Sequence, residues 1–97
     1  MSDFGVRVII SGKVQGVAYR AWAASKAEEL ELNGWIRNLS DGTVEAAFAG
    51  PEETVEQMVE ECGVGPRSAR VDDIERFDLD TDDLNDIEEG FYTRASA

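Results

Sequence analysis

Apolar and polar residues alternate near the start of the chain and then recur at helical spacing. The alternation over 6–10 predicts a strand. After a short loop over 13–19, apolar residues recur every three to four positions over 20–30, as they do on one face of a helix. The dipeptide Asn33-Gly34 is the expected end of this helix.

The same pattern continues through the second half of the chain. Strands predicted over 34–39 and 43–49 are joined around Asp41-Gly42, a dipeptide typical of tight hairpins. A second helix is predicted over 51–62, because proline is tolerated at a helix start and an apolar stripe follows it. Two further strands are expected over 70–78 and 90–96.

The order of these elements predicts an α+β fold of the ferredoxin-like, split βαβ type. We expect an antiparallel five-stranded sheet with two helices on one face, in a single domain over 1–97. No apolar run approaches the ~20 residues that a membrane span needs, and no signal peptide is evident. The single cysteine, Cys62, excludes an internal disulfide and fits a reducing cytoplasm. We therefore predict a cytoplasmic monomer.

Charge narrows the possible partners. The chain has 21 acidic and 9 basic residues, a net charge of −12, which disfavours nucleic acids and anionic membranes. A carboxylate-rich surface of this kind is expected of a protein adapted to high salt. Residues 1–40 hold five bases and four acids, so an anion site is expected there. The absence of histidine excludes Ser-His-Asp and Cys-His nucleophilic sites.

The first strand leads into the first helix through the loop 12–20. Such a loop presents unpaired backbone N–H groups to one point, with the helix dipole behind them, and so forms a cradle for an anion. Arg20 adds a charged, two-pronged donor for phosphate oxygens. Asn38 lies near the end of the next strand, which is parallel to the first with one strand between them. The gap of about 10 Å can be bridged by side chains and a bound phosphate.

Two segments of the chain resemble the signatures of the acylphosphatase family. The first signature, Gly-x-Val-Gln-Gly-Val-x-aromatic-Arg, is matched by Gly12, Val14, Gln15, Gly16, Val17, Tyr19 and Arg20. The second, Gly-aromatic-x-basic-Asn followed by Gly-x-Val and a later Gly, is matched by Gly34, Trp35, Arg37, Asn38, Gly42, Val44 and Gly50.

The resemblance implies hydrolysis of carboxyl–phosphate anhydrides to a carboxylate and phosphate. It implies Arg20 and Asn38 as catalytic residues, and a loop that binds the phosphate of an acyl phosphate substrate. This loop comprises Gln15, Gly16, Val17, Ala18, Tyr19 and Arg20. The activated carboxylate leaving group needs no general acid, so neither a metal nor another cofactor is expected.

Three other interpretations compete with this one. Residues 62–68 resemble the phosphate loop of cysteine-dependent phosphatases, but the spacing from Cys62 to Arg67 is one residue short, and Cys62 is favoured as a core residue. The acidic stretch 78–89 resembles a calcium loop, yet Asp83 replaces the required glycine, so a solvated acidic loop is favoured. A non-catalytic domain that binds a phosphorylated metabolite, or that serves a larger enzyme, is the alternative function.

Overall fold

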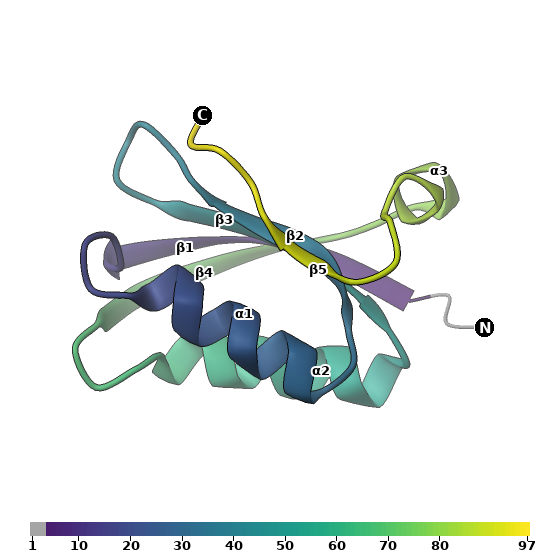
Figure 1. Cartoon of the computed structure of the whole chain (residues 1–97), viewed down its shortest axis with the longest axis horizontal. Helices are drawn as coiled ribbons and strands as arrows, with labels where there is room; N and C mark the ends of the chain where they lie inside the picture. Colours follow the sequence, from purple (N-terminus) through teal and green to yellow (C-terminus); the bar gives the residue numbers. More distant parts are fainter. Residues whose placement is uncertain (1–3) are drawn as a thin grey trace.

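The computed structural model describes residues 4–97 and contains two layers, with helices α1 and α2 packed on one face of a single sheet (Figure 1). In chain order the elements are β1 (Phe4–Lys13), α1 (Tyr19–Glu29), β2 (Asn33–Asn38), β3 (Val44–Gly50), α2 (Glu52–Val64), β4 (Arg70–Asp78), α3 (Thr81–Asn85) and β5 (Phe91–Thr93). None of the helices within 4–97 is long and apolar enough to cross a lipid bilayer.

The sheet has the strand order β4-β1-β3-β2-β5. Its four long strands pair antiparallel, as the sequence predicts, but β5 pairs parallel to β2, with Gly34 opposite Phe91. The prediction of a purely antiparallel sheet is therefore wrong, and the sheet is mixed. The chain leaves β4 at the end of the sheet where β1 and β2 begin. Because β5 starts at that same end, it must run in the direction of β2.

The core lies between the sheet and the two long helices. Val6, Val8 and Ile10 point into it from β1, and the ring of Phe48 on β3 stacks on Phe91 of β5 with centroids 5.6 Å apart. The helices contribute the buried residues Ala23 and Ala27 from α1 and Val55, Met58 and Cys62 from α2. Small alanine side chains on α1 allow the helix to approach the sheet closely.

Helix α1 ends earlier than the sequence predicts. Glu31 has a left-handed backbone with φ 59°, and its N–H donates to the carbonyl of Glu28 at 3.0 Å. The next N–H, that of Leu32, donates to the carbonyl of Ala27 at 2.9 Å, which completes a Schellman motif. This turn buries Leu32, only 2% of which is exposed. Burial of one leucine therefore decides where the helix ends, although a glutamate must adopt a glycine-like conformation.

The acidic stretch after β4 contains a short helix, α3, where the sequence favours a loop. The Asp80 carboxylate accepts a hydrogen bond from the N–H of Asp83 at 2.9 Å and so caps the helix. The Asp80 carboxylate therefore stabilises the start of α3. Leu79 and Leu84 cover Gly5 of β1, where a Cβ atom would lie 2.5 Å from Leu84. Partial burial of these two leucines against β1, which the acidic composition does not indicate, anchors the stretch.

On the sheet face opposite the long helices, one carboxylate joins three strands. Glu45 of β3 is 7% exposed and accepts hydrogen bonds from Arg7 of β1 at 2.8 Å and from Arg37 of β2 at 2.7 Å. Each arginine is about one third exposed, so water screens both ion pairs in part. The shared carboxylate therefore stabilises the centre of the sheet mainly through hydrogen bonds.

We predict that Glu45→Gln destabilises the fold by about 1–2 kcal/mol, because it leaves two guanidinium groups without their carboxylate. The measurement is urea unfolding at fixed salt. The matched control is Glu75→Gln, an exposed β4 residue on the same face of the sheet with no ion pair within 4–97. Equal unfolding free energies for the two variants would contradict the role given to Glu45.

Candidate active site

The chain topology brings the start of α1 and the end of β2 to one edge of the sheet. Strands β1 and β2 both pair antiparallel with β3, which lies between them, so they point the same way. The loop that leaves β1 therefore meets the end of β2. A cavity of about 180 Å³ lies between them. It is lined by Val14, Gln15, Gly16, Ala18, Tyr19, Arg20, Ala21 and Asn38.

Backbone N–H groups at the start of α1 have no partner within 4–97. The first hydrogen bond of the helix joins the N–H of Trp22 to the carbonyl of Ala18 at 3.1 Å, and no side chain caps the N-terminus. None of the N–H groups of residues 16–21 donates to a described carbonyl or side chain outside the helix. Unpaired donors at a helix N-terminus form an anion site.

The loop backbone has the bent form that such a site needs. Gly16 and Ala18 both have positive φ, of 74° and 62°. Left-handed residues alternating with ordinary ones turn successive N–H groups towards one point, which makes a concave anion nest. For Ala18 this conformation is unfavourable by about 1–2 kcal/mol, since its Cβ crowds the backbone. The strained conformation of Ala18 is therefore part of the bend that turns the N–H groups of the loop towards the cavity.

Asn38 contributes the one buried side-chain oxygen that lacks a partner in the described part of the chain. Its Oδ1 is inaccessible to solvent and accepts no hydrogen bond. Its own backbone carbonyl is occupied, since it accepts from the N–H of Ala97 at 3.0 Å. A buried, unpaired amide oxygen is unfavourable by about 1–3 kcal/mol. Asn38 lines the cavity, so a small movement of its side chain would let this oxygen accept a hydrogen bond from a water molecule or a ligand.

Gln15 borders the cavity, but its side-chain amide is already used. The Nε2 group donates to the carbonyl of Leu39 at 2.9 Å and to that of Thr43 at 2.7 Å. Both carbonyls belong to the hairpin that follows Asn38. The amide of Gln15 therefore ties the anion loop to the hairpin, and what this residue can offer a ligand is its backbone.

Two hydrogen bonds hold the hairpin itself. The carboxylate of Asp41 accepts from the hydroxyl of Thr43 at 2.6 Å and from the N–H of Thr43 at 3.0 Å. These bonds hold the pKa of the Asp41 carboxyl below its usual value. The turn next to Asn38 is therefore fixed by its own side chains.

Tyr19 has a buried side chain at the first position of α1. Its ring is 1% exposed, and its hydroxyl donates to the carbonyl of Cys62 at 2.7 Å. Burial, together with the neighbouring thiol of Cys62, raises the pKa of Tyr19 well above its usual value. The phenol is thus committed to the core, and the backbone N–H is what Tyr19 can offer a ligand.

Cys62 lies in the core and is not part of an anion loop. The residue is fully buried in α2, and burial raises the pKa of its thiol to about 12. A nucleophilic cysteine needs an exposed site that stabilises the thiolate. The interpretation of residues 62–68 as a cysteine-phosphatase loop is therefore wrong, and the favoured alternative of a core cysteine is confirmed.

Val17 is the one residue of the predicted binding loop that does not line the cavity. Its carbonyl accepts a hydrogen bond from the hydroxyl of Ser68 at 2.9 Å. Ser68 lies 51 residues further along the chain, in the connection between α2 and β4. Nothing in the local sequence pairs the two residues, so the sequence does not identify Ser68 as part of the site.

Comparison with known proteins identifies the family. The acylphosphatase family model matches residues 6–92. An acylphosphatase of Rhodospirillum rubrum is 61% identical over 67 residues, which cover 69% of this chain and 74% of that protein. The chain belongs to the acylphosphatase family. An acylphosphatase of Haloarcula marismortui is 49% identical over 75 residues, covering 77% of this chain and 82% of that protein.

Solved acylphosphatases share the fold. The crystal structure of the Bacillus subtilis acylphosphatase superposes with a TM-score of 0.87 at 31% identity, covering 94% of this chain and 98% of the other. The acylphosphatase of Coxiella burnetii gives a TM-score of 0.84 at 35% identity, covering 94% and 92% of the two chains. These comparisons confirm the predicted family, the ferredoxin-like fold and the enzyme class.

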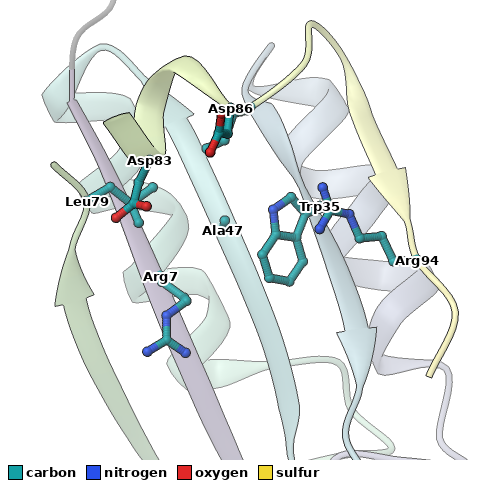
Figure 2. A pocket seen from close by; sticks show the side chains of 8 residues that line it. Arg7, Trp35, Ala47, Leu79, Asp83, Asp86 and Arg94 are labelled. Atoms are coloured by element: carbon teal, nitrogen blue, oxygen red, sulfur yellow. The ribbon is translucent and has the colours of Figure 1, made fainter. Parts of the chain in front are cut away.

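A second hollow in this acylphosphatase lies on the open face of the sheet (Figure 2). It measures about 240 Å³, with Ala47 at its floor between Arg7 and Trp35. Two guanidinium groups and two carboxylates line it, so its charges balance. Arg7 is bound to Glu45, and the guanidinium of Arg94 lies 4.5 Å from the centre of the Trp35 ring. The hollow contains none of the predicted site residues and does not select an anion.

Proposed function

We propose that the cavity at the start of α1 hydrolyses acyl phosphates, with Arg20 and Asn38 as the catalytic residues. One observation carries this proposal. Unpaired backbone donors and Asn38, whose buried Oδ1 has no hydrogen-bond partner, belong to the wall of the same cavity. Donors suit the phosphoryl oxygens, and the acceptor suits a water molecule. The reaction needs both kinds of group, and each would otherwise be unfavourable in the folded chain.

The phosphoryl group would lie in the loop, with its oxygens on the N–H groups and on the guanidinium of Arg20. In phosphoryl transfer, charge is spread over the equatorial oxygens of the transition state. Donors that are already oriented stabilise this charge without reorganising. The Arg20 fork can bind two of these oxygens at once, which an ammonium group cannot copy.

Asn38 would hold the attacking water. A water that donates one hydrogen to Oδ1 keeps a lone pair free to attack phosphorus. The attack must be in line with the leaving carboxylate, so the position of this oxygen sets the geometry. Two bonds from Gln15 to the hairpin fix the phosphate loop relative to Asn38.

The leaving group explains why so few groups are needed. A carboxylate is a stable anion and leaves without being protonated, so no general acid is required. Apart from Arg20 and the buried phenol of Tyr19, no ionisable side chain lines the cavity, and it offers no carboxylate, thiol or imidazole to a metal ion. We therefore propose a metal-free, cofactor-free reaction. The acidic surface, through self-repulsion, and the reduced Cys62 support action as a monomer in the cytoplasm.

The first test is hydrolysis of benzoyl phosphate by the purified protein. We expect turnover that is unchanged by EDTA and that varies little between about pH 5 and 8, because an amide and a guanidinium keep one protonation state there. Loss of activity on chelation would contradict the metal-free mechanism. No turnover at all would favour the non-catalytic alternative, a domain that binds phosphorylated metabolites.

Arg20 and Asn38 should differ in kinetic effect. We expect Arg20→Lys to raise KM and to lower kcat, since the fork contacts the phosphoryl group before and during the reaction. We expect Asn38→Ala to lower kcat by about 100-fold or more with a smaller change in KM, because water is misaligned while the phosphate loop remains. Steady-state kinetics check both expectations. A normal kcat in Asn38→Ala would remove Asn38 from the mechanism.

We also propose that the acidic surface is an adaptation to high salt. The acidic stretch 78–89 lies at the end of the sheet where β1 begins, and the cavity lies where β1 ends (Figure 1). That separation exceeds the Debye length of about 10 Å at 0.1 M salt. Repulsion among carboxylates should therefore limit stability more than it limits substrate binding.

Raising KCl from 0.1 to about 2 M should raise the thermal midpoint by about 5 °C or more, while kcat/KM changes less than about threefold. A variant with Glu53→Gln and Glu60→Gln, both exposed on α2, should show a smaller rise. Thermal unfolding and benzoyl phosphate kinetics measure the two responses. A midpoint that is flat or falls with salt would contradict the proposed adaptation.

A further inference from the structure

The carbonyl of the peptide unit between Val17 and Ala18 is hydrogen-bonded to a residue outside the cavity. The carbonyl of Val17 accepts the hydrogen bond from Ser68 at 2.9 Å, and neither of these residues lines the cavity. In a planar trans peptide the N–H group points opposite to the carbonyl. Ala18 does line the cavity. The bond from Ser68 therefore fixes the N–H of Ala18 on the cavity side.

This peptide has an alternative orientation that would relieve backbone strain. Rotating it by half a turn would move Ala18 from its left-handed φ of 62° to a negative φ, where its Cβ no longer crowds the backbone. The same rotation would turn the carbonyl oxygen of Val17 towards the cavity and the N–H of Ala18 away. A phosphate ion would then meet a negative dipole instead of a donor.

The side chain of Val17 packs against the edge of the core, whereas packing around Gly16 and Ala18 does little to prevent that rotation. The side chain of Ala18 is exposed, and a Cβ placed on Gly16 would meet no atom within 4 Å. The side-chain hydrogen bonds that tie this part of the loop to other segments come from two residues, Gln15 and Ser68. Of these two, only the bond from Ser68 reaches the Val17–Ala18 peptide.

Ser68 itself is held in place by its neighbours. It lies in a turn closed by a hydrogen bond of 3.0 Å from the N–H of Ala69 to the carbonyl of Pro66. The turn follows α2 directly, and Ala69 packs against the core. Ser68 is exposed, so replacing it leaves the core intact.

We propose that Ser68 is a positioning residue, which keeps the Val17–Ala18 peptide in the orientation that binds phosphate. This inference rests on the proposed function, because it assumes that the loop holds the phosphoryl group. Ser68 contacts neither the cavity nor Arg20 and acts through the loop backbone alone. Phosphate bound in the loop restores the binding orientation, so Ser68 affects how readily the ligand binds and not how the bound ligand reacts.

The kinetic consequence follows from the fraction of molecules in the binding orientation. Apparent affinity falls in proportion to this fraction, whereas the rate of the bound complex does not. Loss of one hydrogen bond changes such an equilibrium by about fivefold. We expect Ser68→Ala to raise KM and the inhibition constant of inorganic phosphate by the same factor, up to about fivefold. We expect kcat to stay within about twofold of the unmodified protein.

Two further variants separate positioning from a general effect on stability. Ser68→Thr keeps the hydroxyl and should restore both constants. Ser25→Ala, an exposed serine on α1, is the matched control and should change neither. In an Ala18→Gly background the left-handed conformation carries no penalty, so adding Ser68→Ala should cause a smaller loss than it does beside Ala18.

Binding of inorganic phosphate followed by the amide resonance of Ala18 tests the inference without turnover. We expect this resonance to shift on saturation in all variants, at higher phosphate, by up to about fivefold, in Ser68→Ala. Unchanged phosphate affinity in Ser68→Ala, or a loss confined to kcat, would overturn the role of Ser68. Equal losses in Ser68→Ala and Ser68→Thr would also overturn it. Phosphate binding without benzoyl phosphate hydrolysis would refute the proposed catalysis and leave the role of Ser68 intact.

Discussion

The N-terminus of α1 is left without a cap, and the rest of the site depends on this. A helix usually begins with a side chain that accepts a bond from one of its first N–H groups, a contribution of about 1 kcal/mol. Ala18 occupies that position and has no acceptor. Its left-handed backbone also differs from the extended conformation that a capping serine or aspartate uses, so the first N–H groups of the helix stay free. The unpaired donors are therefore a cost of folding that a bound anion would offset.

Several contacts hold this unfavourable arrangement in place. The ring of Tyr19 is anchored by burial and by its bond to the carbonyl of Cys62, which fixes the first turn of the helix. The side chain of Gln15 secures the start of the loop to the hairpin, and Ser68 secures its end. Each contact comes from a different part of the chain. The loop can remain strained because the sheet and both long helices support it.

The sequence predicts most of the fold because most helices and strands are specified by patterns of neighbouring residues. The strand over 6–10 and the hairpin around Asp41-Gly42 depend on neighbouring residues, and both form as expected. The end of α1 differs from the prediction because Leu32 is buried, and α3 differs because Leu79 and Leu84 pack against β1 despite the acidic composition around them. The parallel pairing of β5 depends on where the chain crosses the sheet edge, which no local pattern records.

The candidate site shows the same division. Arg20 and Asn38 can be found from the sequence, since both stand in motifs and the order of the strands brings them to one edge. The side-chain bonds of Gln15 and Ser68 span 24 to 51 residues of chain, and nothing next to either residue marks them. A motif therefore indicates candidate site residues, while the contacts that orient the loop around them become visible only in three dimensions.

Alignment of water with phosphorus places the strictest demand on this fold. The phosphate would be held by the loop after β1, and the water by Asn38 at the end of β2. A displacement of about 1 Å between reacting groups can lower a rate by about 100-fold. Strand β3 lies between β1 and β2, and Glu45 joins all three through Arg7 and Arg37. By holding β1 and β2 in register with β3, Glu45 on the open face helps to fix the distance between the phosphate loop and Asn38. Alignment of the water would then depend on the sheet itself.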